Sequence, residues 1–215
     1  MRYDPGQGIA LLAYHLARIA RSATDLGFVF DVDTARAALA DIEQPATAKV
    51  RMLLAHGGAL MIEAGSMPAP LVEPIKVGIA ALPVDARDWR LRHKTTDRAF
   101  YDDARAAAIR KDGVAELLFV DPAGWLAEGS FTTLFVRRSG RLLTPPLHRG
   151  VLPGVLRAHL LERGRAVEAD LSPADFVGAA HAGAAFVGNA LRGLMGVRSM
   201  AVADDDGARD LKNPV

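Results

Sequence analysis

The chain has 215 residues, enough to bury a sizeable core, and 50% of them are hydrophobic while 24% are charged, as in ordinary globular proteins. Its 26 Lys and Arg residues nearly balance its 25 Asp and Glu residues, and the net charge of +1 gives no electrostatic reason to expect nucleic acid or an anionic membrane as a partner. The absence of cysteine excludes disulfides, thiolate metal sites and cysteine nucleophiles. We expect no metal at the functional site.

The N-terminal segment MRYDPGQG lacks the features of a signal peptide, and no apolar run approaches the roughly 20 residues that span a bilayer. We therefore expect a cytoplasmic protein without membrane contact. Lysine is rare in the chain, so chemistry that needs a primary amine has few candidates. The lysines are Lys49, Lys76, Lys94, Lys111 and Lys212.

The first third of the chain predicts two helices followed by three strands. Apolar residues recur at three- and four-residue steps over residues 9–26, which is typical of an amphipathic helix, and Gly27 should end it. A second short helix should follow and end before Pro45. Alternating apolar residues then predict strands, the first two as a hairpin, at residues 49–54, 60–64 and 76–82.

The remainder mixes helices and strands without strict alternation, which favours an α+β fold. We expect helices at residues 97–111 and 153–163 and after Ser172, and strands at residues 115–120, 125–136, 141–144 and 184–187. Proline-rich stretches at 68–74 and 83–88 should connect two parts of the chain. We therefore expect a small N-terminal domain, residues 1–85, and a larger domain, residues 86–215.

Several segments carry residue types suited to chemistry, and they follow one another in a distinctive order. They are HLAR (15–18), HKTTDR (93–98), LAEGSFTTLFV (126–136), TPPLHRGVLPGVLR (144–157) and FVGNALRG (186–193). Together they resemble the class IV aminotransferases, a family that includes branched-chain and D-amino-acid aminotransferases and aminodeoxychorismate lyase. The resemblance runs from about residue 1 to residue 197. It implies a two-domain D-amino-acid aminotransferase-like fold, pyridoxal 5'-phosphate as cofactor, and a homodimer.

Lys94 in HKTTDR matches the family's Schiff-base lysine, whose amine binds the cofactor aldehyde and then moves protons as a general acid and base. Without that motif, Lys94 would read as an ordinary solvated lysine. Glu128 in LAEGSFTTLFV matches the family's glutamate at the ring nitrogen, where a carboxylate favours the protonated ring. The alternative for Glu128 is an exposed strand carboxylate, but its neighbours are apolar, so an inward Glu128 would need a partner.

The remaining matches concern the cofactor phosphate and ring. By resemblance, the amides of Val155 and Leu156 at a helix start bind the phosphate, while Leu152 packs against the ring. Arg18 in HLAR matches an arginine that pairs with the phosphate, and its alternative is a surface helix arginine. His15 could line the same pocket or simply pack in the core.

Asn189 and Ala190 fall where the family closes the other side of the phosphate. Transaminases commonly carry a hydroxyl residue there, whereas an Asn-Ala pair resembles the lyase branch. Ala190 would offer only its backbone N–H.

Two features depart from the family pattern. The chain begins where a segment like FETxR would finish, so we expect an N-terminally shortened small domain or a start that lies upstream. The family tyrosine that reaches the ring oxygen has no clear counterpart, because Tyr101 follows Lys94 at too large an offset.

The HKTTDR segment and the Asn-Ala pair favour a lyase that eliminates pyruvate from 4-amino-4-deoxychorismate and releases p-aminobenzoate, as in folate biosynthesis. Such domains often follow a fused chorismate-amination component, which is a possible partner here. The first alternative is an aminotransferase for branched-chain or D-amino acids, because elimination and transamination share the same carbanion. The second is a non-catalytic relative with the same fold.

Overall fold

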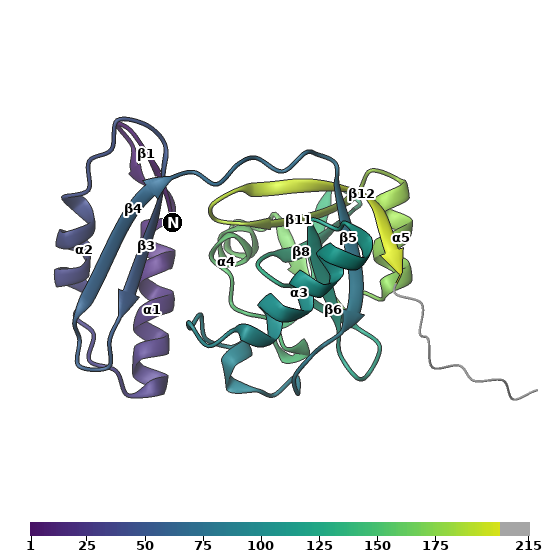
Figure 1. Ribbon diagram of the computed structural model, residues 1–215, viewed down its shortest axis with the longest axis horizontal. Coiled ribbons are helices and arrows are strands. Elements are labelled where there is room, and N and C mark those ends of the chain that lie inside the picture. The colour runs from purple at the N-terminus through teal and green to yellow at the C-terminus, as the bar shows by residue number, and fades with distance from the viewer. Residues whose placement is uncertain (203–215) are drawn as a thin grey trace, which may run out of the picture.

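Residues 1–66 form the smaller lobe of the computed structural model, which describes residues 1–202 and the side chains of residues 1–197. Its four strands pair antiparallel in the order β2-β1-β3-β4, with bounds Gly8–Ile9, Arg2–Asp4, Ala48–Leu54 and Leu60–Ser66. Helices α1 (Leu12–Leu26) and α2 (Val32–Ala40) lie alongside this sheet (Figure 1). The buried side chains of Leu16, Leu39 and Val50 join the helices to the sheet.

The larger lobe is built on an eight-stranded sheet with the order β10-β9-β8-β11-β12-β5-β6-β7. In chain order its strands are β5 (Ile75–Ala81), β6 (Glu116–Val120), β7 (Leu126–Gly129), β8 (Thr133–Arg138), β9 (Arg141–Thr144), β10 (Ala166–Glu168), β11 (Ala185–Asn189) and β12 (Gly193–Val202). Strand β7 lies at one edge, yet the chain passes within four residues into β8, which is third from the other edge. The sheet must therefore curl back on itself.

Helices cover both faces of the curled sheet. Leu118 of β6 belongs to the core cluster that contains Phe176 of α5 (Pro173–His181), whereas Leu117 and Phe119 pack with α3 (Ala99–Asp112). Because successive strand residues point to opposite faces, α3 and α5 lie on opposite sides. Helix α4 (Val155–Glu162) packs on a third cluster, and its contact with α1 brings the two lobes together.

The mixed architecture confirms the expected α+β class, and the predicted hairpin is present as β3 and β4. The single strand expected at 125–136 is wrong, because residues 130–132 separate β7 from β8. The division expected at residue 85 is also misplaced: β5 belongs to the larger sheet, so the first proline-rich stretch forms the connection. Residues 203–215 of the expected second domain lie outside the described residues.

The helices of the described chain are short, and the longest, α1, has 15 residues. Within residues 1–202, no helix combines the length and the apolar character that crossing a bilayer requires.

Candidate active site

Glu128 lies at the end of β7 and is only 5% exposed. Both oxygens of its carboxylate have partners: the Tyr101 hydroxyl donates to Oε1 at 2.9 Å, and the backbone N–H of Leu152 donates to Oε2 at 3.0 Å. Burial raises the pKa of Glu128 to about 7, while these two donors and the Lys94 charge oppose the rise. The carboxylate therefore titrates close to neutrality.

A second buried carboxylate, Glu116 of β6, shapes the chain directly after Glu128. It accepts hydrogen bonds from the backbone N–H of Leu117, Ser130 and Phe131 and from the hydroxyls of Ser130 and Thr132. Burial raises its pKa, and the hydrogen bonds from the Ser130 and Thr132 hydroxyls and the Leu117 and Phe131 N–H groups oppose that rise. Gly129 fits here because a Cβ would lie 2.4 Å from Thr132 Oγ1. This network explains why β7 and β8 are separate strands.

Lys94 lies in the loop between the short 3₁₀ helix Trp89–Leu91 and α3. Its neighbour His93 fixes the loop, because His93 Nδ1 lies 3.0 Å from the hydroxyl of Ser22 on α1. The Lys94 side chain is exposed, yet desolvation by surrounding protein and the charges of Arg18 and Arg98 lower its pKa to about 8. About a tenth of this amine is therefore uncharged at pH 7, far more than for an ordinary lysine, and the uncharged form is the one that a nucleophile requires.

Arg18 lies on α1 one turn before Ser22 and is partly buried. Within the described residues no hydrogen bond or ion pair is found for its guanidinium, and desolvation, with the charge of Arg21, lowers its pKa to about 10. His15, one turn earlier, has a buried Nε2 without a hydrogen-bond partner, and its pKa falls to about 3 through desolvation and the Arg18 charge. An arginine without a carboxylate partner suits an anionic ligand.

The start of α4 provides backbone donors beside these groups. Its N-cap, Gly154, offers no side chain to cap the helix. In the part of the chain that the structure describes, the backbone N–H groups of Val155 and Leu156 have no acceptor. Such N–H groups and the helix dipole favour an anion. Because the Leu152 N–H binds Glu128, the same segment connects the carboxylate to this helix start.

Asn189 and Ala190 lie where β11 turns into β12. The Asn189 side chain shapes this turn: its Oδ1 accepts from the N–H groups of Leu191 and Arg192, each at 3.0 Å, and its Nδ2 donates to the Phe131 carbonyl at 3.2 Å. A pocket of about 430 Å³ brings this turn together with α4, because Leu156, Asn189 and Ala190 all line it. The Asn189 side chain is thus engaged within the turn, and Ala190 offers a ligand no side-chain donor.

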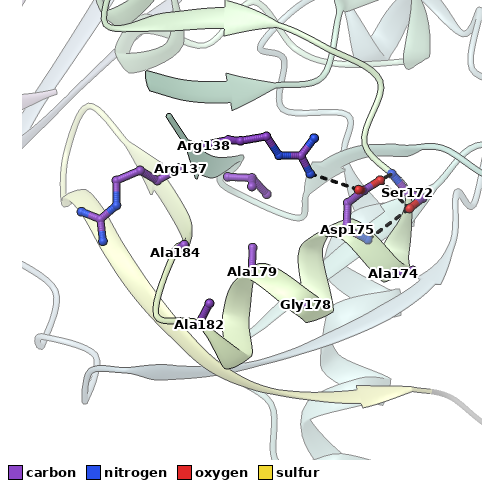
Figure 2. A pocket seen from close by; sticks show the side chains of 10 residues that line it. Arg137, Arg138, Ser172, Ala174, Asp175, Gly178, Ala179, Ala182 and Ala184 are labelled. Atoms are coloured by element: carbon purple, nitrogen blue, oxygen red, sulfur yellow. Dashed lines mark hydrogen bonds and ion pairs between the residues drawn. The ribbon is translucent and has the colours of Figure 1, made fainter. Parts of the chain in front are cut away.

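A second pocket, of about 470 Å³, lies between β8 and α5 and contains none of the predicted site residues. Figure 2 shows that its polar side is an ion pair of Arg138 with Asp175, at 3.2 Å, beside the capping contacts of Ser172. Its other wall consists of small side chains of α5. We assign it no role.

The structure thus places Lys94 within electrostatic range of both Arg18 and Glu128, and links Glu128 through Leu152 to the start of α4. Sequence reasoning missed Glu116, the contact of His93 with Ser22, and the hydrogen bond of Tyr101 to Glu128. The apolar setting of Glu128 did indicate that it needs a partner, but nothing in the sequence identified which one.

The donor set fits pyridoxal phosphate. The Arg18 guanidinium and the N–H groups at the start of α4 suit the phosphate, buried Glu128 suits a ring nitrogen, and the Lys94 amine suits an aldehyde.

The family model for amino-transferase class IV matches residues 1–200, and the chain belongs to this family of enzymes that depend on pyridoxal phosphate. A solved structure named "Putative amino-acid aminotransferase" from Mesorhizobium loti is 34% identical, with 94% of this chain and 96% of that chain covered and a TM-score of 0.81. The curated "Putative aminodeoxychorismate lyase" of Schizosaccharomyces pombe is 26% identical over 167 residues, which are 74% of this chain and 71% of the relative.

The PLP-bound form of a hypothetical aminotransferase from Mycobacterium tuberculosis shares the fold, with a TM-score of 0.77 and 20% identity over 93% of this chain and 78% of that one. These likenesses confirm the expected class IV fold.

Proposed function

We propose that this chain binds pyridoxal 5'-phosphate through Lys94 and catalyses the elimination of pyruvate from 4-amino-4-deoxychorismate, with release of p-aminobenzoate. The single observation that carries the proposal is the grouping of an amine with a pKa of about 8, a buried carboxylate and an arginine that has no ion pair among the described residues. Perturbed pKa values with specific charge partners are typical of functional sites.

When bound, the cofactor supplies an aldehyde that captures the substrate amine and a ring that withdraws electrons from the adjacent carbon. Lys94 would hold the aldehyde and then take the proton from that carbon, since its amine is partly uncharged near neutral pH. Glu128 would bind the ring N–H, and Arg18 with the amides of Val155 and Leu156 would bind the phosphate. The substrate's atoms divide exactly between p-aminobenzoate and pyruvate, so no second substrate is needed.

The lyase proposal is supported by the Asn189-Ala190 turn and by the likeness to the Schizosaccharomyces pombe protein. The Asn189 side chain is held within its turn, and Ala190 has no hydroxyl, so neither residue offers a ligand a side-chain hydroxyl. The alternative is an amino-acid aminotransferase, which the name of the 34% identical Mesorhizobium loti protein favours.

The two activities can be separated with the purified protein loaded with cofactor. Supplied with 4-amino-4-deoxychorismate, it should release p-aminobenzoate and pyruvate in equal amounts, followed by absorbance and by a coupled lactate dehydrogenase assay. Supplied with branched-chain or D-amino acids and 2-oxo acids, it should show little amino-group exchange. Robust exchange without p-aminobenzoate would replace the lyase with the aminotransferase. A colourless protein that binds no added cofactor would contradict both and favour a non-catalytic relative.

Substitution of Arg18 by alanine should weaken binding of pyridoxal phosphate by about 1.5–3 kcal/mol, because a charged hydrogen bond to the phosphate is lost. The quantity to measure is the dissociation constant, by fluorescence titration of the cofactor-free protein. The matched control is Arg36→Ala, which removes an exposed arginine from α2 in the same lobe and should leave binding unchanged. If the Arg18 and Arg36 variants bind pyridoxal phosphate with equal affinity, Arg18 does not contact the phosphate and is an ordinary surface residue.

A further inference from the structure

Tyr101 is the residue outside the sequence-predicted set that contacts the site most directly. It lies in the first turn of α3 and is 6% exposed. Its ring stacks on Phe119 of β6, with ring centroids 4.8 Å apart and an interplanar angle of 20°, and the Phe100 ring lies 4.5 Å away. This packing leaves the hydroxyl a fixed position, from which it donates to Glu128 Oε1 at 2.9 Å.

The hydrogen bond from Tyr101 helps to fix the orientation of the Glu128 carboxylate. One oxygen is held by Tyr101 and the other by the Leu152 N–H, so the plane of the carboxylate is fixed from both ends. Each carboxylate oxygen has a second lone pair that can accept a further donor. Burial, together with the Glu128 charge, raises the pKa of Tyr101, so its hydroxyl remains a donor throughout the neutral range.

We propose that Tyr101 is a positioning residue, which holds the Glu128 carboxylate ionised and oriented so that its free lone pairs can receive the cofactor's ring N–H. The role of the ring nitrogen rests on the proposed function, whereas the hold of Tyr101 on Glu128 does not. Tyr101 acts through Glu128 and differs in this respect from a tyrosine that contacts the ring oxygen.

The charges around Glu128 leave its ionisation sensitive to the Tyr101 hydroxyl. Lys94, from the loop before α3, favours the ionised carboxylate, whereas burial and the Glu116 charge from β6 favour the protonated form. The charges of Arg98 and Asp88 act on the pKa of Tyr101 in opposite directions: Arg98 lowers it and Asp88 raises it. Because these influences leave Glu128 titrating at about 7, removal of one donor should change its ionisation at physiological pH.

The test uses the cofactor-free protein and its variant Tyr101→Phe, which keeps the stacked ring and deletes only the hydroxyl. With glutamate labelled by ¹³C at the side-chain carboxyl, NMR titration should give Glu128 a pKa near 7 in the parent protein and about one unit or more higher in the variant. The Glu128 signal is assigned by its loss in Glu128→Gln. Circular dichroism and thermal melting confirm that the variants are folded.

The matched control is Tyr3→Phe, which deletes the hydroxyl of a buried tyrosine, 9% exposed, in the smaller lobe. It should leave the Glu128 titration unchanged. A Tyr101→Phe protein with the parent's Glu128 titration overturns the proposal, whether or not the cofactor binds. A higher Glu128 pKa in Tyr101→Phe supports the positioning role even if the parent protein shows no turnover. In that case only the proposed lyase reaction is contradicted.

Discussion

Replacing Lys94 with alanine should abolish turnover, by about 10³-fold or more, while the fold persists. The change removes an amine from an exposed side chain in a loop, so little buried volume is lost. Turnover is measured with the lyase and aminotransferase assays, and folding by circular dichroism. The control is Lys111→Ala near the end of α3, where another exposed lysine is removed and activity should be unchanged. Turnover by the Lys94 variant at the parent rate would exclude Lys94 as the cofactor's anchor.

The same residue can be identified chemically. Borohydride reduction of the cofactor-loaded protein should leave a stable label on the peptide that contains Lys94. Lys76 is a poor competitor, because its amine already donates to the Asp112 carbonyl at 2.6 Å. When pyridoxal phosphate is added to the cofactor-free protein, its covalent bond to Lys94 should form faster as the pH rises through about 8, since the uncharged amine is the nucleophile, whereas an ordinary lysine would require a pH of about 10.4. A label on Lys76 or Lys111 would contradict the assignment.

Patterns of neighbouring residues predicted the helices and strands whose ends are set by local sequence, but not the ends that are set by contacts with other segments. Gly27 ends α1 in the left-handed region, with φ 72°, as the sequence indicated. The same helix begins at Leu12 and not at residue 9, because Gly8–Ile9 pairs with β1 before the chain turns. The strand β12, Gly193–Val202, escaped prediction because it begins at a glycine and a second glycine, Gly196, interrupts its apolar pattern.

Contacts between distant segments could not be predicted in this way. The break between β7 and β8 depends on Glu116, 14 residues before Ser130, and the partner of Glu128 lies 27 residues before it. The hydroxyl residues at 130 and 132 stand within an otherwise strand-like segment, and nothing in the sequence indicates that a buried carboxylate gathers their N–H and hydroxyl groups. The candidate site was thus predictable residue by residue through resemblance, whereas its hydrogen-bonding network required the structure.

Substitution of Glu128 by glutamine should lower kcat by about 100-fold or more, with cofactor affinity largely kept. The amide retains the size of the carboxylate and can still accept from the Leu152 N–H, but it carries no negative charge to stabilise a protonated ring nitrogen. Measurement of kcat and of the cofactor dissociation constant separates the two effects. Glu63→Gln, an exposed carboxylate on β4, is the matched control and should change neither quantity.

The pH dependence gives a second measure of Glu128. A carboxyl with a pKa of about 7 is mostly protonated below that pH, so activity should rise with pH as Glu128 ionises. A positive ring nitrogen beside it lowers the pKa, so the acid limb of the loaded enzyme's profile should lie at or below about pH 7. In Glu128→Gln this limb should disappear, because the titrating group is gone. Near-normal rates in that variant, with the limb still present, would show that Glu128 supports the fold and takes no part in the reaction.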